Sequence, residues 1–210
     1  MTANDQGLFV TIDGPGGVGK STALEHTRAR LTRHGLRVHS TREPSGTSLG
    51  ELARHGTETY RGLSLACLVA ADRYHHIETE IQPAVERGEI VLCDRYIASS
   101  LVLQRLDDVP VETVWALNSH ARRPDLSVIL TAEPGVIAQR LRARGAHSRF
   151  EKMPDGSKKE TTLFAEAATF LQEAGFATLV VDCTSRTPAE TADIIAAEIT
   201  RPSARNEHAN

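Results

Sequence analysis

The stretch from Gly14 to Thr22, GPGGVGKST, constrains the fold of this chain more than any other. Its Gly14, Gly19, Lys20 and Ser21 match the phosphate-binding pattern G-x-x-x-x-G-K-[ST]. Glycines let a backbone wrap closely around phosphates, and the helix that follows adds the positive end of its dipole. An apolar run precedes the stretch and a helical pattern follows it, which is the strand–loop–helix context that the motif requires. A plain glycine turn between a strand and a helix is the less favoured interpretation.

The motif assigns chemistry to two side chains. Lys20 is predicted to reach the β- and γ-phosphates of a nucleotide, and the hydroxyl of Ser21 is predicted to ligate Mg²⁺. The other loop positions are predicted to surround the phosphate chain: Pro15, Gly16, Gly17, Val18 and Thr22. We therefore expect a nucleotide cofactor with Mg²⁺.

Length, charge and cysteines narrow the class of protein. The 210 residues predict one domain, 1–210, and the net charge of −3 argues against a general nucleic-acid binder. Cys67, Cys93 and Cys183 are scattered without metal-binding spacing, as expected of free thiols in a reducing compartment. With no long apolar run and no secretory signal at the N-terminus, we expect a cytoplasmic protein without a membrane span.

Apolar runs alternate with helical patterns, which predicts an α/β fold with a parallel sheet and helices on both faces. Five strands are expected at residues 8–12, 36–40, 89–93, 126–131 and 177–181, with the first in the centre of the sheet. Helices are expected at 20–34, 48–55, 63–87, 96–106, 111–120, 134–144, 161–174 and 188–199. Pro83 is expected to kink the long third helix. Residues 145–159 are predicted to form a mobile flap, and 201–210 a frayed tail.

Charged residues follow two of the predicted strands, at the edge where open α/β sheets bind ligands. Asp94 is predicted to hold the metal, directly or through water, and Arg95 to bind a phosphate; a strand-end salt bridge is the alternative. Arg42 is a candidate for an acceptor phosphate, with Glu43 orienting it. The local sequence of Arg42 and Glu43, taken alone, fits a solvated ion pair on a surface turn better than it fits a phosphate-binding site.

An arginine-rich stretch without acidic residues runs from the predicted helix 134–144 into the flap: Arg140, Arg142, Arg144 and Arg149. Phosphoryl transfer places negative charge on the moving group, and an arginine stabilises it. The glycine loop itself contains no arginine. We therefore predict an arginine-rich lid over about residues 140–159 that delivers Arg149, Arg144 or Arg140; a solvated basic helix is the alternative.

Taken together, these residues resemble the thymidylate kinase family, which transfers phosphate from ATP to dTMP. The matching segments are, in chain order, IDGPGGVGKST, TREPSGTSLGE, AADR, ERGEIVLCDRYIASSL, RPDLSVIL, the arginine-rich flap and LVVD. The resemblance implies a three-layer P-loop kinase fold, ATP with Mg²⁺, a role in nucleotide biosynthesis and a homodimer packed through helices. It also implies that Arg140 and Arg144 contact ATP, and that Arg144 and Arg149 serve the transferred group.

The resemblance further implies a site for the acceptor nucleotide. Arg42 and Arg95 would clamp the acceptor phosphate near Asp94, Glu43 and the metal, and Arg73 would hydrogen-bond the base. The remaining expected acceptor residues are Asp13, Pro44, Val69, Ser99, Ser100, Leu103 and Gln104.

The sequence departs from the family in this pocket. Val69 stands where a stacking Phe is usual, and Leu103 where Tyr is usual, with Tyr74 or Tyr96 as candidates to refill the space. Further differences from frequent family residues lie at Ser45, Ala98 and Ser148. The lost rings leave a kinase of a modified nucleotide, or of another phosphorylated acceptor, as the alternative to dTMP.

Two alternatives without kinase turnover also remain, a nucleotide-binding switch and a nucleotide-dependent structural subunit. Arg42, Arg95 and Asp94 argue against the switch, because a switch needs no acceptor clamp.

Overall fold

The computed structural model describes residues 7–145 and 149–201. The predictions for Ser148 and for the tail beyond residue 201 lie outside these ranges. The described cysteines are all free thiols, with Cys93 and Cys183 buried and Cys67 exposed.

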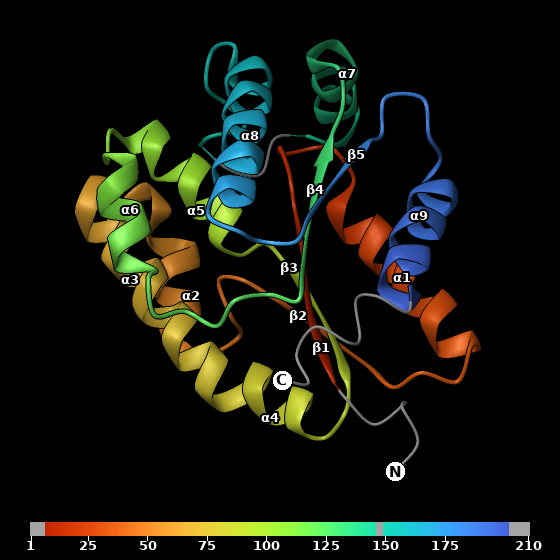
Figure 1. Cartoon of the computed structure of the whole chain (residues 1–210). Helices are drawn as coiled ribbons and strands as arrows, with labels where there is room; N and C mark the ends of the chain where they lie inside the picture. The colour runs from red at the N-terminus through yellow and green to blue at the C-terminus, as the bar shows by residue number, and fades with distance from the viewer. Residues whose placement is uncertain (1–6, 146–148, 202–210) are drawn as a thin grey trace.

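A five-stranded parallel sheet forms the middle of the molecule (Figure 1). Its strands are β1 (Leu8–Asp13), β2 (Val38–Arg42), β3 (Ile90–Asp94), β4 (Leu126–Thr131) and β5 (Thr178–Asp182). The spatial order is β2-β3-β1-β4-β5, so the first strand is central, as predicted. Every residue of β1 is buried, which explains its continuous apolar character.

Helices cover both faces of the sheet, which confirms the predicted three-layer fold. They are α1 (Lys20–Arg33), α2 (Ser48–His55), α3 (Gly62–His76), α4 (Gln82–Glu86), α5 (Ile97–Leu103), α6 (Val111–Leu117), α7 (Pro134–Arg144), α8 (Gly156–Glu173) and α9 (Pro188–Thr200). Val10 and Ile12 of β1 belong to the core shared with α1, α7 and α9. Phe9, which points to the other face, belongs to the core shared with α5, α6 and α8.

The predicted helix 63–87 is interrupted by a π-helical turn at Ile77–Ile81, between α3 and α4. Pro83 lies just after this turn, within the first residues of α4. A proline cannot donate to the carbonyl four residues earlier and its ring clashes with that carbonyl, so a wider turn accommodates it. The helical run therefore spans about the predicted residues, and its irregularity lies at the π turn that precedes Pro83.

Other boundaries also differ from the sequence prediction. β2 begins two residues later than expected, because Val38 pairs with Ile90 and Arg42 with Asp94. α5 ends at Leu103 and is followed by a short 3₁₀ turn at Arg105–Asp107. α8 begins at Gly156, so the last residues of the predicted flap are helical. None of the helices in the described ranges is long and apolar enough to cross a membrane.

Candidate active site

The glycine loop joins the end of the central strand to the start of α1. Gly14, Gly17 and Gly19 have φ values of 150°, 81° and 109°, which side chains rarely adopt. A Cβ on Gly14 would also lie 2.5 Å from the carbonyl oxygen of Leu130. The glycines are therefore required by the loop's path, as the motif predicts.

Lys20 is folded back onto this loop. Its Nζ donates to the carbonyl oxygens of Gly14 and Pro15, at 2.9 Å each. Burial, aided by the nearby guanidinium of Arg95, lowers the pKa of Lys20 to about 7. An ammonium group held in this way beside a glycine loop gains most when an anion enters the loop.

Ser21 and Asp94 meet at the ends of α1 and β3. Ser21 Oγ donates to Asp94 Oδ2 at 2.6 Å, whereas the buried Oδ1 of Asp94 has no hydrogen-bond partner among the described residues. Hydroxyl and carboxylate oxygens are the ligands that Mg²⁺ prefers, with phosphates and water completing its shell. The pair fits the predicted metal. Within the described ranges, no group of three or more His, Cys, Asp or Glu side chains could hold a metal ion by itself.

A cleft of about 720 Å³ lies over the glycine loop and the carboxyl edge of the sheet. It gathers most of the predicted phosphate-binding side chains with one cation that the sequence analysis missed, Arg54 of α2. Its charged lining residues are Lys20, Arg42, Glu43, Arg54, Asp94, Arg95, Arg140, Arg144 and Glu151. Burial and the neighbouring Arg42 lower the pKa of Arg54 below its ordinary value. The excess of cations suits a site for two phosphate-bearing molecules.

A smaller cavity of about 80 Å³ adjoins the cleft. Nine of the eleven predicted acceptor residues line it. The lining residues are Glu43, Pro44, Ala53, Thr57, Leu65, Val69, Arg73, Arg95, Tyr96, Ser99, Ser100, Leu103, Gln104 and Phe150. Glu43 and Arg95 line both the cavity and the cleft. A phosphate carried by a molecule in the cavity would therefore emerge beside Arg95, facing the glycine loop.

Arg95 is held in an unusual backbone conformation at this junction. Its φ of 75° lies in the left-handed region, and its N–H donates to the carbonyl of Ile12 at 3.0 Å. Nη1 of its guanidinium is buried without a hydrogen-bond partner among the described residues. Backbone strain together with an unpaired buried donor is typical of a binding residue awaiting its ligand.

Arg73 is fixed by a set of buried partners. Its Nε donates to Glu43 Oε2 at 2.8 Å, its Nη2 to Ser100 Oγ at 3.0 Å, and its Nη1 to Asn118 Oδ1. The guanidinium also lies 4.9 Å from the ring centre of Tyr96. Most of the N–H donors of Arg73 are thus bound inside the protein. Its contact with an acceptor base stays a prediction and would use the donors that remain.

Two predicted acceptor residues lie outside the cavity. Arg42 lines the cleft instead. Asp13 is fully buried, and its Oδ1 accepts from Tyr96 N and Ser99 N at 2.9 Å each and from Ser99 Oγ at 2.6 Å. Burial raises the pKa of Asp13 despite these bonds. The carboxylate holds the start of α5, and its contact with substrate stays a prediction.

The predicted lid arginines lie in different places. Arg140 donates to the carbonyls of Val18 and Cys183, and Arg144 pairs with Glu151 at 2.8 Å, both beside the cleft. Arg149 instead lies toward the acceptor cavity. It donates to Asp107 Oδ1 at 2.6 Å and to the carbonyl of Thr57 at 2.7 Å, and its guanidinium stacks 4.1 Å from the ring centre of Phe150.

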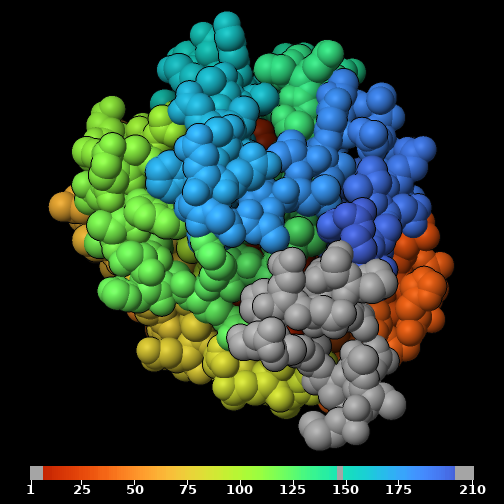
Figure 2. All heavy atoms as spheres, in the orientation of Figure 1, coloured from red at the N-terminus to blue at the C-terminus, as the bar shows by residue number. Residues whose placement is uncertain are grey.

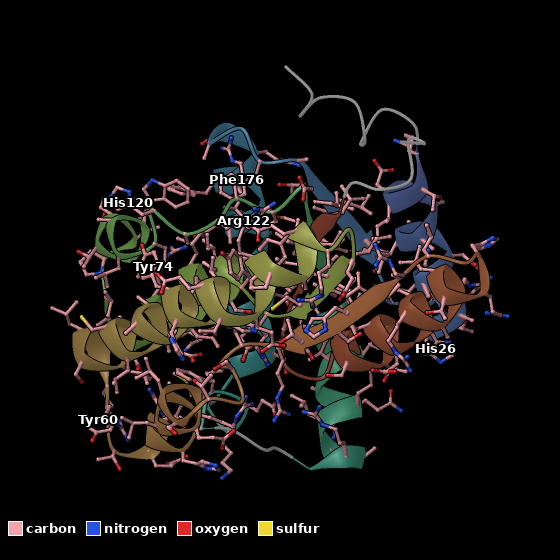
Figure 3. All side chains as sticks on the ribbon, turned by 90° about the horizontal axis from the view of Figure 1, so that it is seen from below. His26, Tyr60, Tyr74, His120, Arg122 and Phe176 are labelled. Carbon is pink, nitrogen blue, oxygen red and sulfur yellow. The ribbon has the colours of Figure 1, made fainter. Side chains whose placement is uncertain are left out.

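The cavity contains two aromatic side chains, those of Tyr96 and Phe150. Tyr96 is one of the two residues that the sequence suggested as replacements for the missing rings. Tyr74, the other, donates to the carbonyl of Leu117 at 2.9 Å and lies on the side of α3 that faces α6 (Figure 3). Phe150, only 5% exposed, closes the cavity from the lid segment. The only indication in the sequence was that Phe150 follows Arg149, a predicted lid residue. The periodicity of apolar residues does not predict which loop residues line a pocket.

Two carboxylates from the lid side converge on Gly16. Its N–H donates to Glu160 Oε2 of α8 at 2.7 Å, and a Cβ at this position would lie 2.6 Å from Glu151 Oε1. Both glutamates were missed, since the sequence gives no sign that α8 approaches the loop.

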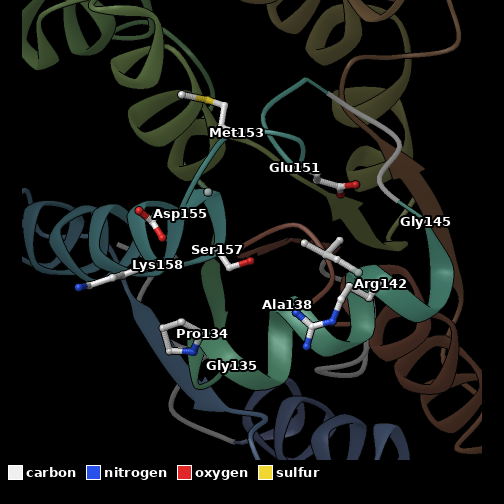
Figure 4. A pocket seen from close by; sticks show the side chains of 12 residues that line it. Pro134, Gly135, Ala138, Arg142, Gly145, Glu151, Met153, Asp155, Ser157 and Lys158 are labelled. Atoms are coloured by element: carbon white, nitrogen blue, oxygen red, sulfur yellow. The ribbon is translucent and has the colours of Figure 1, made fainter.

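A further cavity of about 730 Å³ lies between α7 and the start of α8 (Figure 4). Figure 2 shows a hollow between these helices, with red atoms of the N-terminal part of the chain at its bottom. Pro134, Arg142, Ser157 and Lys158 are among its lining residues. Most of its lining residues fall within the predicted lid, residues 140–159, but none of them was predicted as a catalytic or binding residue.

A glycine loop at the end of a central parallel strand, and a cationic cleft joined to a second pocket, together define the class: a P-loop kinase that acts on nucleoside monophosphates, and hence a phosphotransferase. The comparisons with known proteins agree. The thymidylate kinase family model matches residues 12–183. The chain belongs to the thymidylate kinase family, which confirms the resemblance in its motifs.

Individual relatives support this assignment. A thymidylate kinase of Caldicellulosiruptor saccharolyticus is 35% identical over 184 residues, covering 80% of this chain and 89% of the relative. A probable thymidylate kinase of Pyrobaculum aerophilum is 37% identical over 198 residues, covering 92% and 96%. One of Caldivirga maquilingensis is 39% identical over 152 residues, covering 70% and 74%.

Proposed function

We propose that this protein transfers the γ-phosphoryl group of ATP to dTMP and so forms dTDP. The observation that carries the proposal is the junction of the acceptor cavity with the phosphate cleft at Arg95 and Glu43. Two anionic substrates bound there would meet end to end. Membership of the thymidylate kinase family supports the identity of both substrates.

The side chains act by positioning and by neutralising charge. The loop amides and Lys20 hold the phosphates of ATP, while Arg42 and Arg95 hold the phosphate of the acceptor in line with them. Ser21 and Asp94 are the residues that would hold Mg²⁺. Bound there, the ion supplies charge neutralisation on the phosphate oxygens.

The arginine-rich segment from residue 140 to 159 is proposed to act as a lid. Arg140 and Arg144 already line the cleft, so they are the candidates for the donor phosphates and the transferred group. Arg149 is proposed to serve the acceptor side, because it lies with Phe150 beside the acceptor cavity. Closing the lid over both substrates would exclude water and suppress hydrolysis of ATP.

A second candidate function is phosphorylation of a modified nucleotide by the same chemistry. The observation that favours it is the aliphatic lining at Val69 and Leu103, where the family usually has aromatic rings. A pocket with less stacking surface discriminates less against acceptors other than thymidylate.

A coupled assay of ADP release tests the proposal. Purified protein is supplied with ATP and Mg²⁺ and, in separate reactions, with dTMP, dUMP, other nucleoside monophosphates and base-modified analogues. The proposed function requires the highest kcat/KM for dTMP. A higher value for a modified nucleotide would support the second candidate, and ADP release with no acceptor would contradict both.

We also propose that the protein forms a homodimer through helices, as the family resemblance implies. Exposed apolar side chains on α2 and around the start of α3 support this: Leu52, Tyr60 and Leu63 are 45%, 37% and 54% exposed. Light scattering coupled to size exclusion should give twice the 22.8 kDa chain mass. A Leu63→Glu variant should shift the equilibrium toward the monomer, and a monomeric wild type would contradict the proposal.

A further inference from the structure

A buried histidine lies behind the residues that hold Arg73. His76, at the end of α3, is fully buried. Its Nδ1 lies 3.4 Å from Oε1 of Glu43, the carboxylate whose other oxygen accepts from Arg73. Its Nε2 lies 2.8 Å from Thr41 Oγ1 and 3.3 Å from Glu80 Oε2. Each nitrogen of the ring therefore faces a carboxylate.

This arrangement requires particular hydrogen bonds. A neutral imidazole donates from only one nitrogen, and donation from Nδ1 to Glu43 leaves Nε2 to face the Thr41 hydroxyl at 2.8 Å. Burial alone would raise the pKa of Glu80, but hydrogen bonds from His39 and Thr41 lower it below its ordinary value, so this partner is charged.

The π-helical turn brings Glu80 into this set. Glu80 lies within the turn that follows α3, and its Oε1 accepts from His39 Nε2 of β2 at 2.8 Å. The connection runs from the partly exposed His39 and Glu80, through the buried His76, to Glu43 and the acceptor cavity. Irregular turns of this kind often mark functional positions in helices.

We propose that His76 is a positioning residue for the acceptor nucleotide. It holds the Glu43 carboxylate in place, and Glu43 in turn holds the guanidinium of Arg73 against the cavity. His76 lines neither the cavity nor the cleft, so its effect is on acceptor binding and passes through Glu43. The inference rests on the proposed function only for the identity of the acceptor.

The groups that face His76 come from three parts of the chain. Thr41 belongs to β2, Glu43 follows that strand, and Glu80 belongs to the π turn. The imidazole therefore connects the π turn to the residues at the end of β2.

Two substitutions separate the two ring nitrogens. In His76→Asn, the amide nitrogen can take the place of Nδ1 and still donate to Glu43. In His76→Gln, the amide reaches toward the place of Nε2 instead. We expect His76→Gln to raise the KM for dTMP about tenfold, as loss of a hydrogen bond to a charged group allows, with kcat and the KM for ATP nearly unchanged. In His76→Asn, the KM for dTMP should stay close to that of the wild type.

The two Michaelis constants give a readout that a merely structural role would not move. A general loss of structure would change kcat and the KM for ATP as well, whereas loss of the contact with Glu43 should raise the KM for dTMP alone. His75→Gln, an exposed neighbour on the same helix, is the matched control and should follow the wild type.

The outcomes are distinguishable. If wild type does not use dTMP, the proposed function fails, and the same comparison is made with the best acceptor from the screen. A His76→Gln variant with wild-type acceptor KM, or with an equal rise in the KM for ATP, would overturn the proposal. If both His76 variants fail to fold, Glu80→Gln decides the question: it should raise the KM for dTMP while the KM for ATP stays nearly unchanged, and a wild-type KM for dTMP would contradict the role of His76.

Discussion

Lys20 carries a proton-linked step in nucleotide binding. Burial and the nearby Arg95 lower its pKa to about 7, so at about pH 8 most of the free protein holds it neutral. The phosphates of ATP favour the ammonium form, which raises this pKa on binding. ATP binding at about pH 8 should therefore take up nearly one proton and should weaken as pH rises above the free value.

Calorimetry of ATP binding in buffers with different ionisation enthalpies measures this uptake. Lys20→Ala should take up no proton and should lower kcat by about a hundredfold or more, since it removes a charge from the β- and γ-phosphates. Equal proton uptake by wild type and variant, or wild-type turnover by the variant, would contradict the assignment of Lys20 to the phosphate-binding site.

Leu103 tests whether the acceptor pocket has lost stacking contacts. We expect Leu103→Tyr to raise kcat/KM for dTMP by about two- to tenfold, the range that one aromatic contact supplies. Val180→Tyr adds the same ring to an exposed position of β5 and should have no effect. An unchanged or lower value for Leu103→Tyr would mean that Phe150 and Tyr96 already fill the space.

Sequence reasoning found the residues that belong to contiguous motifs, such as Lys20, Asp94 and Arg95. It did not find Arg54, Phe150 or Glu160, which reach the site from helices or loops with no motif of their own. The positions of these three residues depend on how helices and loops pack together. A local sequence pattern does not predict which elements come into contact. Arg73 was identified through the AADR segment of the family resemblance.

At the scale of elements, Asp13 links the central strand to α5. Asp13→Ala would leave two backbone N–H groups and the Ser99 hydroxyl without their acceptor, which should destabilise the protein by about 3 kcal/mol. α5 also carries Ser100 and Leu103, so the KM for the acceptor should rise.

Asp13→Asn is the matched variant. It keeps an oxygen where Oδ1 accepts its bonds, and burial already disfavours the charged form, so its stability should stay within about 1 kcal/mol of wild type. Denaturant unfolding of both variants makes the comparison. Equal losses in the two would show that charge, rather than capping of α5, is what Asp13 contributes.

Element order and strand count followed from the sequence, since alternation of apolar runs and helical patterns has few folded solutions. The register of β2 and the interruption of the third helix did not follow. β2 is fixed by pairing with β3, a partner far along the chain. The π turn could not be predicted from Pro83, because a proline indicates that a helix is irregular but not on which side of the proline the backbone changes.

At the scale of the whole molecule, the lid arginines divide between the two substrates. We expect Arg144→Ala to lower kcat by about 10²- to 10³-fold, because Arg144 lines the phosphate cleft. Arg149→Ala should instead raise the KM for dTMP, because Arg149 pairs with Asp107 beside the acceptor cavity. Arg142→Ala, whose side chain lines the cavity between α7 and α8, is the control. The reverse pattern for Arg144 and Arg149 would contradict this division.

The central claim is that two anionic substrates meet head to head between the glycine loop and Arg95. A crystal structure with Mg²⁺ and a bisubstrate analogue, in which adenosine and thymidine are joined through their 5′-phosphates, tests it most directly. The account predicts a phosphate chain that starts within the amides of residues 14–22, passes between Arg42 and Arg95, and ends with thymine beside Val69 and Leu103. A phosphate chain outside the loop, or a thymidine outside this cavity, would contradict it.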